Sequence, residues 1–194
     1  MRPGCLINQS AITRGLTRLG PSFIKFHEAL YIFHRLNIDE SPFATATAIE
    51  FADLLYLKRE YTAAEKEVRR ALEIQQRTLP KESPYFAAPW TVLGKILTQT
   101  GRAVEAERYL RDALALRTRT VKNGHWSIAT TEGALGECLT AQRHNAEAEP
   151  MLIESYSSLK ASQGEQNPRT VEARHRLVKF YEAWGKTDEV ARYR

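Results

Sequence analysis

The chain has 194 residues, which is long enough for one sizeable domain or for a short array of repeats. Hydrophobic residues make up 43% and charged residues 26%, a balance that is typical of folded globular proteins and argues against intrinsic disorder. The net charge is +5, but Lys and Arg are interspersed with Glu and Asp, which favours solvated helix faces over a basic stripe that follows phosphates.

Residues 1–40 are predicted to form a degenerate helical unit that caps the rest of the chain. Four large apolar residues recur at helical spacing in "PSFIKFHEALYIFHRLN": Phe23, Phe26, Leu30 and Phe33. Such a stripe is suited to close the end of a helical stack. The preceding stretch, "LINQSAITRGLTRL", is expected to supply the partner helix. The first residues, "MRPGCLINQS", contain no continuous apolar segment of the kind found in secretory signals.

From residue 41 onward the sequence repeats at an interval of 42 residues, without insertion or deletion. The stretches "KREYTAAEKEVRRALEIQQRT", "TGRAVEAERYLRDALALRTRT" and "QRHNAEAEPMLIESYSSLKAS" correspond to one another at this interval. The periodicity predicts repeat units over residues 41–82, 83–124 and 125–166, followed by a truncated unit over 167–194. We expect these units and the N-terminal segment to form one continuous domain.

The first half of each unit is predicted to be a helix with one apolar face. A large apolar residue occupies the same position in every unit, a small residue follows it in three of the four units, and another large residue comes three positions later. Spacings of three and four residues mark one face of a helix, and the small residue allows a neighbouring helix to approach closely. The first of these positions holds Phe51, Leu93, Leu135 and Leu177.

A turn and a second helix follow in each unit. Gly101 and Gly185 occupy the same turn position, where a left-handed residue would end the helix. Arg59 and Arg143 replace glycine in the other two turns, which are therefore predicted to be strained or differently built. The second helix shows an apolar stripe at offsets of four, seven and eight residues. Pro150 falls near its first turn in the third unit and need not break it.

The fold class predicted from these patterns is all-α, an α-solenoid of antiparallel helix hairpins with about four units, since strand-type alternation appears nowhere. The words "LGKILTQTGRAVEAERYLRDALALR" and "LGECLTAQRHNAEAEPMLIESY" resemble tetratricopeptide repeats of the 42-residue type named after kinesin light chain. The unit-opening "SP", "SP" and "NP" steps correspond to His-Pro in that family. The resemblance is strong over residues 41–194 and weak over 22–40. It implies a right-handed superhelix with the first helices on its concave side, where peptides usually bind.

The chain departs from that family in three respects, one of which is that about four units make less of a superhelical turn than a long array does. The cargo-binding members of the family carry asparagines that clamp a peptide backbone, and here the same positions hold Ile49 and Glu50, Thr91 and Val92, Gly133 and Ala134, and His175 and Arg176. The sequence also stops inside a second helix, whereas an array normally has a polar terminal cap. We therefore expect a longer parent protein, or an uncapped C-terminal end that a partner or a second copy covers.

Ten residues are predicted to lie on the concave face and to contact a protein or peptide partner: Asp53, Tyr56, Thr91, Lys95, Gln99, Glu137, Thr140, His175, Lys179 and Glu182. The two lysines indicate some acidic character in the ligand. The alternative is that these are solvated helix residues without any ligand contact.

No catalytic or metal-binding constellation is found, so the chain is predicted to be a non-enzymatic protein without cofactor or metal. Neither a phosphate-binding glycine loop nor a His-Glu-x-x-His motif occurs. His27 and His34 lie seven residues apart on one predicted helix, which fits surface histidines better than metal ligands. Cys5 and Cys138 show no metal-type spacing and indicate a reducing, cytoplasmic compartment.

The function predicted from these observations is that of a protein–protein interaction module, as a scaffold or as the regulatory or docking part of a larger signalling protein. No apolar run approaches the roughly 20 residues needed to cross a bilayer, so no membrane association is expected. The alternative is a basic helical-repeat protein that binds RNA or DNA, which only the positive net charge suggests. Clustering of Lys and Arg on one face would favour nucleic acid, and scatter would favour a protein partner.

Overall fold

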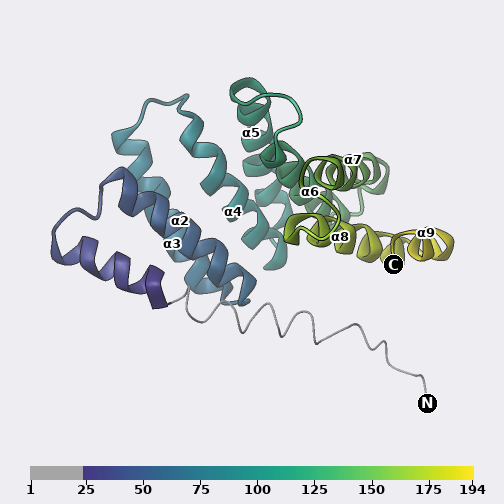
Figure 1. Ribbon diagram of the computed structural model, residues 1–194, viewed down its shortest axis with the longest axis horizontal. Helices are drawn as coiled ribbons and strands as arrows, with labels where there is room; N and C mark the ends of the chain where they lie inside the picture. Colours follow the sequence, from purple (N-terminus) through teal and green to yellow (C-terminus); the bar gives the residue numbers. More distant parts are fainter. Residues whose placement is uncertain (1–23) are drawn as a thin grey trace, which may run out of the picture. The chain divides into compact units, whose positions relative to one another are not determined.

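The computed structural model describes residues 24–194, and in this range the chain consists of helices and connecting turns without any strand (Figure 1). The all-α prediction is therefore confirmed. Phe23 and the partner helix expected for the capping unit lie outside the described residues. The described residues divide into two compact units, the first ending at Arg77 and the second covering Thr78–Arg194, which are described separately. The repeat boundaries derived from the 42-residue step stay predictions.

The first unit contains a helix over residues 24–35, followed by α2 (Pro42–Leu57) and α3 (Tyr61–Thr78). The start of α2 follows from its sequence, because the Ser41 hydroxyl accepts a hydrogen bond from the Ala44 N–H at 3.1 Å and Pro42 occupies the first helical turn. The core of this unit consists of the small and large residues of the repeat pattern, among them Ala48, Phe51, Ala52, Leu55, Ala64, Val68 and Ala71.

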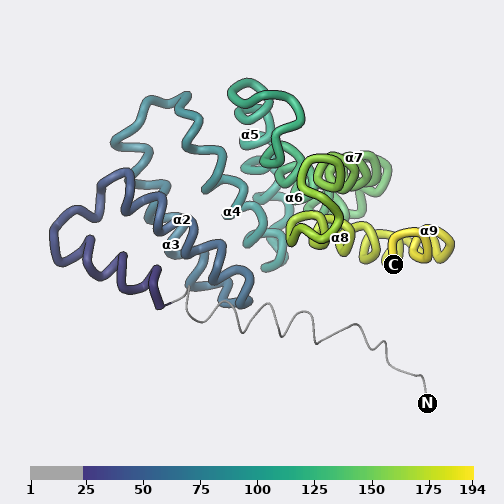
Figure 2. Tube along the Cα trace, viewed as in Figure 1, coloured from purple at the N-terminus to yellow at the C-terminus, as the bar shows by residue number. Residues whose placement is uncertain are grey.

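The second unit begins with the short 3-10 helix η1 (Pro84–Phe86) and continues with six α-helices: α4 (Ala87–Gln99), α5 (Ala103–Thr120), α6 (Trp126–Ala141), α7 (Asn145–Gln163), α8 (Pro168–Trp184) and α9 (Thr187–Tyr193). The Cα trace in Figure 2 follows them from teal to yellow as successive helix hairpins. Helix α6 is the centre of the unit, because it packs against α4, α5, α7 and α8.

The apolar columns of the repeat lie in the core of the second unit. Leu93, Leu135 and Leu177 are fully buried at equivalent places in α4, α6 and α8. The small residue that follows the large one in the repeat pattern allows the second helix of the hairpin to pack closely. A Cβ atom added to Gly136 would lie only 2.7 Å from Cγ of Leu152 in α7, so a larger residue would push the hairpin apart.

The turns inside the hairpins share one backbone geometry, whether or not glycine is present. The φ angles are 63° at Arg59, 80° at Gly101, 65° at Arg143 and 77° at Gly185. In each turn the next N–H bonds to a carbonyl five residues back, for example Glu60 to Leu55 at 2.9 Å and His144 to Leu139 at 2.9 Å. The arginine turns therefore have the same build as the glycine turns but are strained. A residue with a side chain loses about 1 kcal/mol of stability in the left-handed conformation.

Helix α7 accommodates its proline as the sequence predicted. Pro150 lies inside α7, close to its start, and the helix continues to Gln163. A proline this near the N-terminus removes at most one of the first intrahelical hydrogen bonds, so the packing of the hairpin is preserved.

Candidate functional site

Three first helices of the second unit meet at the carboxylate of Glu137. This side chain projects from α6 and accepts a hydrogen bond from Gln99 Nε2 of α4 at 2.8 Å. It accepts a second from Arg176 Nε of α8, also at 2.8 Å. Glu137 thus links the helices on either side of α6. We call Gln99, Glu137, Glu172 and Arg176 the Glu137 cluster.

Arg176 is the buried cation of this cluster. Only 5% of its side chain is exposed, and besides Glu137 it contacts Glu172 Oε1 through Nη2 at 2.5 Å. Gly133 of α6 makes room for the guanidinium, because a Cβ atom there would lie 3.3 Å from Arg176 Nη1 and 2.6 Å from the Ser155 hydroxyl oxygen. A buried ion held by two carboxylates fixes the side chains around it in one arrangement.

Electrostatics favour the charged form of Glu137. Burial alone would raise the pKa of its carboxyl, but the attraction of Arg176, with smaller contributions from Lys179 and Lys95, outweighs burial and lowers the pKa below its usual value. The neighbouring His175 behaves in the opposite sense. Burial and the charge of Lys179 lower the pKa of its imidazole, so its neutral form is favoured at pH 7.

The structure brings five of the ten predicted site residues together around the cluster: Lys95, Gln99, Glu137, His175 and Lys179. They differ in accessibility. Lys95 is buried, with 7% exposure, whereas Lys179 is exposed and His175 is half-buried. Lys179 is therefore the basic group of this set that a ligand can reach most easily.

The other predicted residues of the second unit bond elsewhere. Thr91 is buried and donates its hydroxyl hydrogen bond to the Ala87 carbonyl at 2.7 Å. Thr140 donates to the carbonyl of Gly136 at 2.7 Å, within its own helix. Glu182 is exposed and accepts a hydrogen bond from Arg194 at 2.9 Å.

Asp53 and Tyr56 lie on α2 of the first unit and are half-buried. The ring of Tyr56 is 5.8 Å from that of Tyr61, measured between centroids. This contact joins the C-terminal end of α2 to the start of α3, which gives Tyr56 a packing role within its hairpin.

Sequence reasoning did not single out Arg176, Glu172 or Arg117 as site residues. Arg117 of α5 reaches α6, where its Nη1 donates to the Ser127 carbonyl at 2.7 Å and to the Thr131 hydroxyl, and burial lowers its pKa to about 10. One signal for the cluster was present in the sequence. Glu172 precedes Arg176 by four residues, a spacing that places both on one side of a helix.

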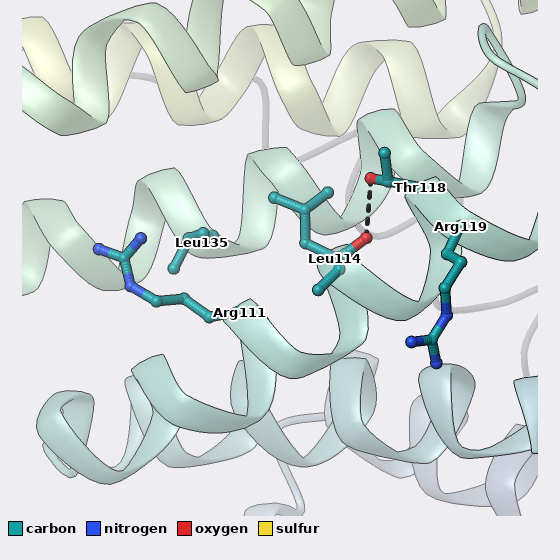
Figure 3. A pocket seen from close by; sticks show the side chains of 6 residues that line it. Arg111, Leu114, Thr118, Arg119 and Leu135 are labelled. Atoms are coloured by element: carbon teal, nitrogen blue, oxygen red, sulfur yellow. Dashed lines mark hydrogen bonds between the residues drawn. The ribbon is translucent and has the colours of Figure 1, made fainter. Parts of the chain in front are cut away.

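A cavity of about 420 Å³ lies beside α5 in the same unit, and Figure 3 shows Arg111 at one end, Arg119 at the other and Leu114 between them. It is lined by Arg111, Leu114, Ala115, Thr118, Arg119 and Leu135. Arg111 already binds two carboxylates, Glu107 at 2.7 Å and Glu147 at 2.6 Å. None of the predicted site residues lines this cavity.

The part of the chain that the structure describes contains no group of three or more His, Cys, Asp and Glu side chains arranged to hold a metal ion. In the same residues, no helix is both long enough and apolar enough to span a bilayer.

Residues 43–119 match the model of the tetratricopeptide repeat family. None of the curated proteins matches this chain. Two crystal structures of nearly identical TPR-like repeats from a Podosopora anserina kinesin light chain, one of them a variant, are similar in fold. Each is 19% identical in sequence to this chain, and each match covers 95% of this chain. The matches cover 86% and 87% of those chains, with TM-scores of 0.65 and 0.64 respectively.

The crystal structure of BtubC (BKLC) from P. vanneervenii is similar as well, with 20% identity, coverage of 94% of this chain and 70% of that chain, and a TM-score of 0.62. At these identities the likeness concerns the fold. The family model, these folds and the buried 42-residue columns agree with the resemblance seen in the sequence. Residues 43–119 therefore match tetratricopeptide repeats, and the described part of the chain has the α-solenoid fold of the kinesin-light-chain repeat structures.

Proposed function

We propose that this protein is a non-enzymatic interaction scaffold that binds a protein or peptide partner on the surface formed by α4, α6 and α8. The observation that carries the proposal is the Glu137 cluster. Its ion pair between Arg176 and Glu137 joins α8 to α6, and the Gln99–Glu137 hydrogen bond adds α4, while Lys179 and His175 remain accessible beside it. Such an arrangement presents polar side chains in fixed positions, which lowers the entropic cost of binding.

The charges around the cluster favour an acidic ligand. The cations Lys95, Arg176 and Lys179 act on Glu137, and Glu172 is the second carboxylate in direct contact with Arg176. Of these three cations, Lys179 is the one that is exposed. An acidic side chain or a chain-terminal carboxylate of the partner could form an ion pair with the exposed ammonium of Lys179.

Nucleic-acid binding is the second candidate, and the arrangement of basic residues does not favour it. Many arginines are held by carboxylates on their own or a neighbouring helix, as in Arg69–Glu65, Arg102–Glu105 and Arg111–Glu147. A surface that follows phosphates needs basic side chains that are gathered and available. The dispersed ion pairs therefore support a protein partner over a nucleic acid. In its more specific form, our proposal is that the scaffold serves as a cytoplasmic docking part of a larger signalling protein.

The experiment that tests the proposal measures binding of fluorescent peptides that differ only in their number of acidic residues, by fluorescence anisotropy. We expect affinity to rise with peptide acidity and to fall about tenfold in Lys179→Glu, because the exposed cation nearest the cluster is reversed. Lys66→Glu is the matched control, since Lys66 is also an exposed lysine on a helix. Equal binding by both variants would refute the assignment to this surface, and preference for RNA over all peptides would favour the second candidate.

A further inference from the structure

The helix over residues 24–35 is apolar on two opposite faces. One face holds Phe26, Ala29, Leu30 and Phe33, which are partly buried in the first unit. The opposite face holds Ile24, Tyr31 and Ile32, of which 57%, 58% and 52% are exposed, and Leu36 directly after the helix is 62% exposed. A short helix that buries only one of two apolar faces leaves an unusual amount of apolar surface in water.

Two charged residues lie on the same exposed face. Ile24, Glu28, Tyr31 and Arg35 follow one another at spacings of four, three and four residues, which places them in one line along the helix. Glu28 and Arg35 are both exposed, and neither forms an ion pair with any residue in the range 24–194. They lie about 10 Å apart along the helix axis, too far to pair with each other.

This line of residues is complementary to itself. An antiparallel second copy of the helix, related by a twofold axis between Tyr31 and Ile32, brings Tyr31 opposite Ile32 of the other copy. Glu28 and Arg35 are equally distant from that axis, so Glu28 meets Arg35 of the second copy and Arg35 meets its Glu28. Twofold interfaces have this property, because each contact occurs twice.

We propose that this protein forms a homodimer through the exposed face of helix 24–35, with the two helices antiparallel. The occupant of the face is a second copy, because an acid and a base placed symmetrically about an apolar centre match the same surface in reverse. This surface differs from the C-terminal end, where the sequence suggested self-association. It also goes beyond the proposed function, since it concerns the first unit and needs no partner on α4, α6 and α8.

The interface is small, because each copy contributes about three turns of helix. Contacts of this size lie at the weak end of specific protein interfaces, so we expect reversible association with a dissociation constant of about 1–100 μM. Apolar contact at Tyr31 and Ile32 supplies most of the affinity, and the two symmetric ion pairs fix the antiparallel register.

The test uses sedimentation equilibrium of the full chain and of charge variants at increasing protein concentration. Wild type is expected to pass from monomer to dimer. Glu28→Arg leaves four positive charges facing one another in the dimer and Arg35→Glu leaves four negative ones, so each should weaken association about tenfold or more. The double variant Glu28→Arg/Arg35→Glu restores both pairs in reversed polarity and should dimerise like wild type.

Mixing the two single variants gives the most selective result. One carries only positive and the other only negative charges at these sites, so the mixture should form a heterodimer although neither variant pairs well with itself. Unchanged circular dichroism of the variants shows that folding is intact. A wild type that stays monomeric up to about 500 μM overturns the proposal, since that exceeds the expected dissociation constants. Single variants that dimerise as well as the double variant overturn it too.

Discussion

Helix 24–35 of the first unit and α6 of the second unit differ in how completely their side chains are enclosed. Helix α6 contacts helices on several sides, and Leu135, Cys138 and Leu139 are fully buried. In helix 24–35 every side chain is partly or largely exposed. In a repeat protein each helix obtains its stability from its neighbours, so a helix that the described residues cover on one side only gains less from them and retains surface for other contacts.

Truncating the central leucine should have the largest effect. Leu135→Ala removes a fully buried side chain from α6 and is expected to lower the free energy of unfolding by about 3–5 kcal/mol, because the surrounding helices cannot close the cavity. All three tryptophans, Trp90, Trp126 and Trp184, lie in the second unit, so fluorescence during urea unfolding follows that unit alone.

Two further variants calibrate this result. Val104→Ala alters a side chain of the same unit that is 79% exposed and should change stability by less than about 0.5 kcal/mol. Leu30→Ala in helix 24–35 removes a partly buried leucine, and circular dichroism should show a loss of only about 1–2 kcal/mol. Equal losses for Leu30→Ala and Leu135→Ala would contradict the distinction between the two helices.

Removing the buried cation of the Glu137 cluster should have the next largest effect. Arg176→Ala leaves Glu137 and Glu172 without their shared partner, and breaking a buried ion pair in this way costs about 3 kcal/mol. Arg35→Ala in the first unit is the matched comparison, since this exposed arginine has no ion-pair partner among the described residues. Its effect on monomer stability, measured by chemical unfolding at low protein concentration, should stay below about 0.5 kcal/mol. A loss under about 1 kcal/mol for Arg176→Ala would show that solvent replaces the missing cation.

The sequence predicted the buried apolar columns and the turns better than the polar contacts of the Glu137 cluster. The buried column of Leu93, Leu135 and Leu177 follows from periodicity, because a 3.6-residue repeat and a 42-residue step determine which face each residue occupies. The left-handed turns at Arg59 and Arg143 follow from their alignment with glycines, although the side chain alone would argue against that backbone.

The ion pairs could not be predicted in the same way. Arg176 was recognised only as a position at which the family's asparagine is missing. Its contact with Glu137 spans 39 residues and joins α8 to α6, and it needs the space left by Gly133. Whether long side chains of different helices meet depends on their rotamers and on the distances between the helices. The periodicity of the sequence gives neither of these. Which of several polar residues on one face meet is therefore decided by packing.

The pH dependence of stability should reveal the charge of Glu137. Its pKa in the folded protein is lowered from 4.5, so this carboxylate stabilises the fold above about pH 4.5, and the contribution is lost as pH falls through the folded pKa. We expect the difference in unfolding free energy between wild type and Glu137→Gln to be largest near pH 6–7 and to shrink below about pH 4.5. A difference in unfolding free energy that stays constant between about pH 7 and pH 3 would mean that the negative charge of Glu137 does not contribute to stability.

The turns offer the smallest change, and the only one expected to stabilise the protein. Arg143→Gly removes the side chain from a residue whose backbone has a φ of 65°, which relieves strain and should stabilise the second unit by about 0.5–1 kcal/mol. The higher entropy that glycine gives to the unfolded chain offsets part of this gain. Gly101→Ala introduces the same strain at a φ of 80° and should lower the stability of the same unit by about 1 kcal/mol.

The first unit contains the same kind of turn at Arg59, where φ is 63°, so Arg59→Gly should give a gain of similar sign when unfolding is followed by circular dichroism. Because the two arginine turns share one backbone geometry, the gain in stability from relieving backbone strain should be similar in both units. This should hold even though the helices of the two units are enclosed to different degrees. Opposite signs for Arg59→Gly and Arg143→Gly would show that side-chain contacts of the arginines, rather than the left-handed backbone, decide the stability of these turns.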